Sequence, residues 1–185
     1  MTALRRNLEL KARCRDLAFA RAAALELGAA VSAFERQRDT FFHAREGRLK
    51  LREITRWTGD VDPAQAPSTS AAELIWYDRP DHLTARTSSY RLVPAPDPAP
   101  LQAALAAACG VRGVVVKSRA ILLWQGVRIH LDTVEELGEF VEFEAVLGPD
   151  LGDATAAERL AALQAALALR DADRVAHAYA DLLGL

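Results

Sequence analysis

Charged residues alternate with apolar residues in several strand-like stretches of this 185-residue chain. A β-strand turns successive side chains to opposite faces, so each alternating set points to one face. The opposite faces are apolar, so helices can pack against them. The charged faces would then turn toward one another, and burying so many charges with nothing between them is costly. The pattern favours a wet, open-ended cavity that holds a polyanion and its metal ions.

The basic residues of these faces suit a phosphate chain. Arginine binds phosphate oxygens in a bidentate way, and lysine adds a point charge. Together they match a triphosphate, with metal ions and carboxylates balancing the remaining charge. The set comprises Lys11, Arg13, Lys50, Arg52, Arg79, Arg86, Lys117, Arg119 and Arg128. The alternative is a group of solvent-exposed strand faces with cross-strand ion pairs.

The acidic residues of the same faces are Glu9, Asp132, Glu142 and Glu144. Their oxygen atoms are the ligands that Mg²⁺ and Mn²⁺ prefer, and such ions use one or two carboxylates together with substrate phosphates. Glu142 and Glu144 stand side by side on one strand face, where like charges repel unless a cation lies between them. Ion pairing with the arginines alone is the alternative. His130 fits either a general base or a hydrogen-bonded interior histidine.

Composition excludes several classes of protein. A hydrophobic content of 51%, a charged content of 26% and a net charge of -2 describe a globular chain without the basic field that nucleic acid needs. Cys14 and Cys109 lack zinc spacing. The chain shows neither a signal peptide nor an apolar run of the roughly 20 residues that a membrane span needs. We therefore expect a cytoplasmic protein that binds no nucleic acid and no membrane, and a homodimer stays open.

Hydrophobic periodicity and turn residues predict the order of the elements. Strands are expected at residues 4–14, 31–43, 48–57, 72–79, 84–94, 112–124, 126–134 and 139–147. Helices are expected at residues 16–27 and 97–110, a loop at 59–70, and two C-terminal helices within about 154–184. Thr155 and Glu158 have the spacing of a capping box. Strands in hairpin-like succession predict an α+β fold, a closed eight-stranded antiparallel barrel over about 4–148 within one domain, 1–185.

Six short stretches resemble one known family. Residues 7–13, Asn-Leu-Glu-Leu-Lys-Ala-Arg, resemble the E-x-E-x-K opening of the CYTH proteins, the triphosphate tunnel metalloenzymes. Residues 47–53, 73–79, 116–119, 127–132 and 140–144 are similar to later strands of that family, in the same order. Within the family the chain is most similar to class IV adenylyl cyclases and to thiamine-triphosphatase-like proteins.

The resemblance implies a triphosphate in the lumen, contacted by the basic residues named above other than Arg13. We also expect Arg13 to contact the substrate, and Lys11, Arg52 and Lys117 to act in catalysis. The resemblance also implies Mg²⁺ or Mn²⁺ on Glu9, Asp132, Glu142 and Glu144. The expected substrate is ATP, thiamine triphosphate or tripolyphosphate.

Asn7 stands where the family motif has its first Glu. Together with the short N-terminus, this substitution favours hydrolysis of a triphosphate to diphosphate and phosphate. Two alternatives stay open. One is a class IV adenylyl cyclase that converts ATP to cyclic AMP and pyrophosphate, and the other is a non-catalytic module that binds polyphosphate or nucleotide.

Overall fold

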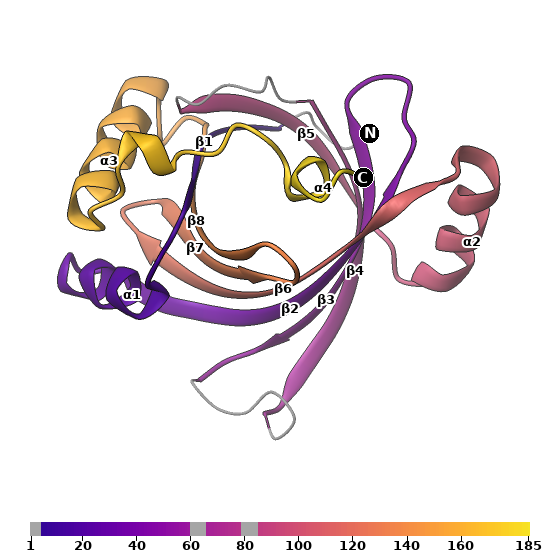
Figure 1. The fold of residues 1–185 in the computed structure, drawn as a ribbon, viewed down its shortest axis with the longest axis horizontal. Coiled ribbons are helices and arrows are strands. Elements are labelled where there is room, and N and C mark those ends of the chain that lie inside the picture. The colour runs from indigo at the N-terminus through magenta and orange to yellow at the C-terminus, as the bar shows by residue number, and fades with distance from the viewer. Residues whose placement is uncertain (1–4, 60–65, 79–84) are drawn as a thin grey trace.

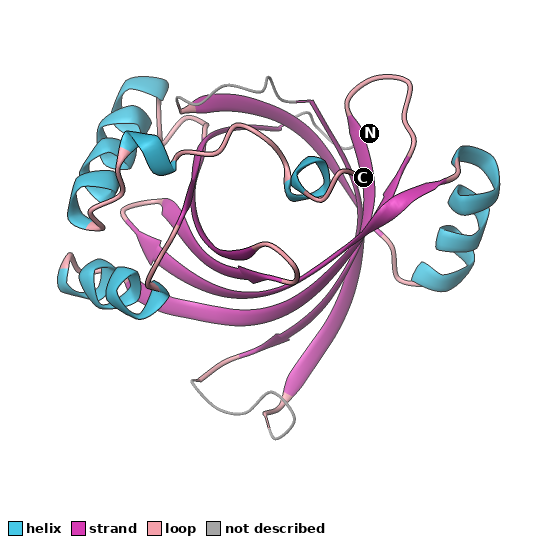
Figure 2. Ribbon diagram, in the orientation of Figure 1, coloured by secondary structure: helices cyan, strands magenta, loops and turns pink. Residues whose placement is uncertain are grey.

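Eight antiparallel strands close into a barrel in the order β1-β5-β4-β3-β2-β6-β7-β8 (Figures 1 and 2). The structure is a computed structural model that describes residues 5–59, 66–78 and 85–185. The strands are β1 Arg5–Arg13, β2 Ala30–Phe42, β3 Arg48–Trp57, β4 Ser68–Asp78, β5 Arg86–Pro94, β6 Val111–Trp124, β7 Val127–Val134 and β8 Gly138–Val146. The predicted α+β fold and closed barrel are confirmed. The expected loop at 59–70 was too long, because β4 begins at Ser68 and pairs with Trp57 of β3.

The apolar outer faces of the strands carry the helices, as the alternation predicts. Leu10 of β1, Ile129 of β7 and Phe143 of β8 belong to one buried cluster. The helices α1 (Leu17–Glu26) and α3 (Asp153–Ala166) cover this cluster from outside, on one flank of the barrel in Figure 1. Burial of this outer face leaves the inner face to the charged residues.

Helix α2 (Pro98–Cys109) lies on the opposite flank of the barrel (Figure 1). It covers a smaller cluster built around Phe42 and Leu51, which are almost fully buried. Asp97 precedes the helix and Gly110 follows it, as expected from the sequence. Asp16 likewise caps α1, where its carboxylate accepts a hydrogen bond from the backbone N–H of Phe19 at 2.8 Å.

The C-terminal part contains two α-helices, as expected, but the second is much shorter than the first. Helix α3 starts after Gly152, so the capping-box interpretation of Thr155 and Glu158 was wrong. A 3-10 turn at Asp171–Asp173 and the one-turn helix α4 (Tyr179–Leu182) follow. In Figure 1 α4 lies within the ring of strands, at one end of the barrel. Among the described residues, no helix has the length and apolar character that crossing a membrane requires.

Gly47 in the turn between β2 and β3 gives a stability prediction. Its φ is +68°, and a Cβ atom there would lie 2.7 Å from the carbonyl oxygen of Tyr77. We expect Gly47→Ala to lower the free energy of unfolding by about 1–3 kcal/mol, through a strained backbone and this clash. Gly28 is the control, since its φ is also positive but no atom lies within 4 Å of a Cβ position. Urea unfolding should show a smaller loss for Gly28→Ala, and equal losses would contradict the role of the clash.

Candidate active site

A cavity of about 850 Å³ fills the interior of the barrel. Its wall includes side chains from all eight strands, together with Ala178 and Tyr179 from the C-terminal segment. The volume is in the range of pockets for small organic molecules. The charged inner faces thus surround a space that a ligand can enter.

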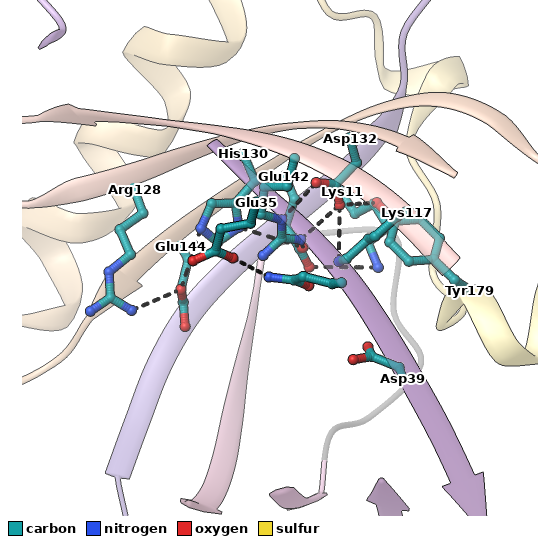
Figure 3. A network of polar contacts seen from close by, with 12 residues as sticks. Lys11, Glu35, Asp39, Lys117, Arg128, His130, Asp132, Glu142, Glu144 and Tyr179 are labelled. Atoms are coloured by element: carbon teal, nitrogen blue, oxygen red, sulfur yellow. Dashed lines mark hydrogen bonds and ion pairs between the residues drawn. The ribbon is translucent and has the colours of Figure 1, made fainter. Parts of the chain in front are cut away.

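The most buried ion pairs centre on Asp132, whose side chain is fully buried on β7. Arg119 donates to both carboxylate oxygens, at 2.6 and 2.7 Å. Lys117 donates to Oδ2 at 3.2 Å, and the Tyr179 hydroxyl donates to the same oxygen at 2.9 Å (Figure 3). Burial raises the pKa of Asp132, but Arg119 and Lys117 outweigh it and hold the pKa well below its usual value. Asp132 does not line the cavity. Its position therefore fits a counter-ion of the basic residues better than a metal ligand.

The ammonium groups of Lys117 and Lys11 lie in the same region. The Nζ atoms lie 5.0 Å and 3.9 Å from the centre of the Tyr179 ring. Lys11 also pairs with Glu142 at 3.5 Å. Burial, followed by the charge of Arg119, lowers the pKa of Lys117 to about 7. Lys117 can therefore gain or lose a proton near neutral pH.

A second centre on β2 and β3 is built around Asp39. Arg52 donates to both oxygens of this carboxylate at 2.7 Å, and Lys50 donates to Oδ2 at 2.7 Å. Burial raises the pKa of Asp39, but Arg52 and Lys50 outweigh it and hold the pKa far below its usual value. Burial, followed by the charge of Arg52, lowers the pKa of Lys50 to about 8. The carboxylate fixes both cations where they line the cavity.

Three further carboxylates that line the cavity lie on β1 and β8. Glu9 and Glu144 are directly paired across these strands, and both line the cavity with Glu142. Arg128 donates to Glu144 Oε2 at 3.2 Å, and Asn7 Nδ2 donates to Oε1 at 2.6 Å. The Oδ1 atom of Asn7 is buried without a hydrogen-bond partner.

This oxygen set fits a hard divalent cation, because carboxylates and an unpartnered amide oxygen meet at one side of the cavity. Within residues 5–59, 66–78 and 85–185, no three or more His, Cys, Asp or Glu side chains are already arranged to hold a metal ion. The metal-ligand assignment of Glu9, Glu142 and Glu144 stays a prediction. His130 lies between the last two, with Nδ1 3.7 Å from Glu142 and Nε2 3.9 Å from Glu144.

Some of the predicted site residues are not seen to line the cavity. Arg13 is exposed, donates to the carbonyl oxygen of Leu137 at 3.2 Å, and does not line the cavity. Arg79 and the side chain of Arg86 lie outside the described residues. The predicted site residues that line the cavity are Glu9, Lys11, Lys50, Arg52, Lys117, Arg119, Arg128, Glu142 and Glu144.

Sequence analysis missed several polar residues that line the cavity, among them Glu35, Gln37, Asp39 and Tyr179. Glu35, Gln37 and Asp39 alternate on β2, but Arg36 and Arg38 lie between them, so residues 35–39 have the period-two spacing without the apolar opposite face that marks the other strands. Glu35 is buried, accepts from Gln37, and pairs with Arg56 of β3. Tyr179 had no comparable signal, because it follows the last strand by more than thirty residues and reaches the site only through the path of the C-terminal segment.

Comparisons with known proteins agree with this architecture. The sequence profile of the CYTH domain matches residues 5–179. The chain belongs to the CYTH family. CYTH proteins bind triphosphates, are typically enzymes, and form a class of triphosphate tunnel metalloenzymes, which implies a divalent cation. No match was found among curated proteins.

Solved structures share the CYTH barrel at low sequence identity. The PH1012 protein from Pyrococcus horikoshii OT3 has a TM-score of 0.74 and 19% identity, over 95% of this chain and 98% of that one. A candidate adenylate cyclase from Vibrio parahaemolyticus has a TM-score of 0.72 and 21% identity, over 97% and 98%. HpAC1 from Hippeastrum, a candidate adenylyl cyclase with a dominant triphosphatase activity, has a TM-score of 0.56 and 13% identity, over 97% and 93%. These likenesses show the fold.

The two lysine pKa values predict that triphosphate binding takes up protons above neutral pH. With pKa values of about 7 and about 8, Lys117 and Lys50 lose their charge in the free protein as the pH rises toward about 9. A bound phosphate chain favours the charged lysines and raises their pKa. The affinity for tripolyphosphate should therefore fall above pH 7, by up to about tenfold per pH unit for each proton taken up.

Calorimetry in buffers of different ionisation enthalpy measures this proton uptake. The Lys117→Arg variant is the control, since a guanidinium group stays charged and should take up about one proton less at pH 8. An affinity that stays constant between about pH 7 and 9 would contradict the prediction.

Proposed function

We propose that this protein is a metal-dependent cytoplasmic enzyme that hydrolyses a triphosphate bound in the lumen of its barrel. One observation carries the proposal. Lysine and arginine side chains from β1, β3, β6 and β7 reach one cavity, and the carboxylates on β1 and β8 lie along one side of it. The lysines and arginines can bind a phosphate chain, and the carboxylates can bind a divalent cation on that chain.

Arg52 and Arg119 would bind phosphate oxygens while remaining fixed by their own carboxylates. Each already holds an Asp through two parallel hydrogen bonds, so its side chain is ordered before substrate arrives. Lys11 and Lys117 would neutralise charge that develops on the transferred phosphoryl group. Such preorganised cations lower the barrier because they need no rearrangement during the reaction.

Glu9, Glu142 and Glu144 would hold the metal ion together with substrate oxygens. The ion, when bound, polarises the phosphoryl group and neutralises charge on the leaving oxygen. The chain's own contribution is to place these carboxylates beside the cation cluster, since Glu142 also accepts from Arg119 at 3.0 Å. Glu144 is held by Asn7 and Arg128 on its two oxygens.

Asn7 supports hydrolysis over cyclisation. Its amide group donates to Glu144 Oε1 and adds no negative charge. A carboxylate at this position would bind the metal more strongly than the amide of Asn7 does. The relative from Hippeastrum, with its dominant triphosphatase activity, is consistent with this choice.

An adenylyl cyclase is the second candidate, and the apolar part of the cavity supports it. Aliphatic side chains line the cavity beside the charged ones, namely Ile54, Ile75, Leu92, Ile121 and Leu123. Such a surface suits the organic group of an organic triphosphate better than bare tripolyphosphate. A nucleoside held there would bring its ribose to the phosphate chain.

A product assay distinguishes these reactions. Purified protein is incubated with ATP, thiamine triphosphate or tripolyphosphate, and Mg²⁺ or Mn²⁺, and all phosphorus products are resolved. We expect orthophosphate and a diphosphate, with an organic triphosphate turned over faster than tripolyphosphate. Cyclic AMP with equal pyrophosphate would favour the cyclase. Tight binding without any product would favour the binding module.

Glu144→Gln tests the carboxylate set. The amide keeps the size of the side chain but removes its charge, so we expect kcat to fall by about two orders of magnitude or more in the presence of metal. Glu135→Gln is the matched control, because Glu135 is exposed and pairs with Arg36. Turnover that stays unchanged in Glu144→Gln and still requires metal would remove Glu144 from the site.

A further inference from the structure

His130 of β7 lies between two carboxylates of the candidate site and is almost fully buried. Its Nδ1 atom is 3.7 Å from Glu142 Oε2, and its Nε2 atom is 3.9 Å from Glu144 Oε2 (Figure 3). Both distances are too long for a hydrogen bond. Nδ1 is buried without any hydrogen-bond partner. The imidazole therefore faces two carboxylate oxygens without donating to either.

Other cations already balance these two carboxylates. Glu142 pairs with Arg119 at 3.0 Å. Glu144 pairs with Arg128 at 3.2 Å. A positive charge on His130 is not needed there, and burial favours the neutral ring. A neutral imidazole has one N–H and one nitrogen lone pair, so whichever nitrogen holds the proton, the lone pair of the other faces a carboxylate oxygen. A cation between those two atoms would remove the repulsion.

Oxygen atoms suited to such a cation lie on the Glu144 side of the ring. Glu9 is paired directly with Glu144 across β1 and β8, and it lines the same cavity. Asn7 donates its amide N–H to Glu144 Oε1 at 2.6 Å, while its own Oδ1 atom is buried without a partner. The side chain of Arg128 is 48% exposed, so it can leave Glu144 Oε2 and turn to solvent.

The Glu142 side of the ring is less open to a metal ion. Arg119 and Lys11 hold the Glu142 carboxylate, and the side chain of each is only 5% exposed. A proton on Nδ1 would point toward Glu142 and leave the lone pair of Nε2 on the Glu144 side. A carboxylate that accepts from the second ring nitrogen is the usual way in which a protein orients a histidine ligand.

We propose that His130 binds the divalent cation through Nε2, next to Glu144, and that this nitrogen makes the site prefer Mn²⁺ or Co²⁺ to Mg²⁺. The inference rests on the proposed function. Ligand atoms about 2.1 Å from one ion lie about 3.0 to 4.2 Å apart, so the 3.9 Å between Nε2 and Glu144 Oε2 suits an ion between them. Mg²⁺ favours oxygen ligands, whereas imidazole suits transition-metal ions.

Pulsed EPR of bound Mn²⁺ tests the nitrogen ligand directly. The whole protein is mixed with Mn²⁺ and a methylene-bridged analogue of tripolyphosphate, which contains no nitrogen and is not hydrolysed. We expect the ¹⁴N coupling of a directly bound imidazole, replaced by a ¹⁵N coupling when the histidines carry ¹⁵N. His130→Gln should lose this signal. His43→Gln is the matched control and should keep it, because His43 is exposed and does not line the cavity.

Metal affinities test the preference for transition-metal ions. Calorimetry with the same analogue gives the Kd of Mn²⁺, Co²⁺ and Mg²⁺ for each protein. His130→Gln replaces a nitrogen ligand with an amide oxygen, so we expect the affinities for Mn²⁺ and Co²⁺ to fall by about tenfold or more and that for Mg²⁺ by about threefold or less. His43→Gln should leave all three unchanged. Thermal unfolding checks that each variant is folded, and His130→Asn replaces His130→Gln if the latter is not.

Bound Mn²⁺ without an imidazole coupling in the unmodified protein would overturn the inference and leave the proposed function standing. A coupling that persists in His130→Gln would overturn it as well, and so would equal losses of affinity for Co²⁺ and Mg²⁺. If no divalent cation strengthens binding of the analogue, the proposed metal-dependent function is wrong, and this inference with it.

Discussion

The structure depends on one constraint, which is that charges enclosed in a barrel must be paired. Asp132 and Asp39 meet this constraint on β7 and β2, the two strands that flank β6. Each carboxylate holds an arginine through two hydrogen bonds and a lysine through one. Removing a carboxylate would leave buried cations uncompensated, which costs far more than the pair contributes. The cations are therefore held in place before ligand binds, and most of the cost of ordering them is met during folding.

The same constraint explains the architecture around the lumen. A sheet with a charged inner face needs an apolar outer face to drive folding, and helices to cover that face. Phe143 and Ile129 belong to this apolar outer face, whereas the residues next to them on the same strands are charged or polar and belong to the inner face. Closure of the barrel also leaves no unpaired strand edge. The charged interior is thus stabilised indirectly, by packing on the outside.

Sequence alternation predicted the barrel and most of the charged residues that line the cavity, because both follow from period-two patterning within single strands. It missed Asp39 and Glu35, because Arg36 and Arg38 occupy the alternate positions of β2 and no apolar face there distinguishes the inside from the outside. It could not show that Asp132 lies behind Lys117 and Arg119, since depth within a barrel depends on strand tilt and neighbours. Nor could it reveal Tyr179, whose position is set by the tertiary path of the C-terminal segment.

If the carboxylates on β1 and β8 hold the metal as proposed, metal and triphosphate would bind together. In the free protein Glu142 accepts from Arg119 and pairs with Lys11, and Glu144 accepts from Arg128 and Asn7. A metal ion alone would have to displace these partners and leave cations unpaired. A phosphate chain supplies a new partner for each cation, and the released carboxylates can then turn to the metal. On that assignment each ligand would remove the main cost of binding the other, so their affinities would be coupled, and equally in both directions.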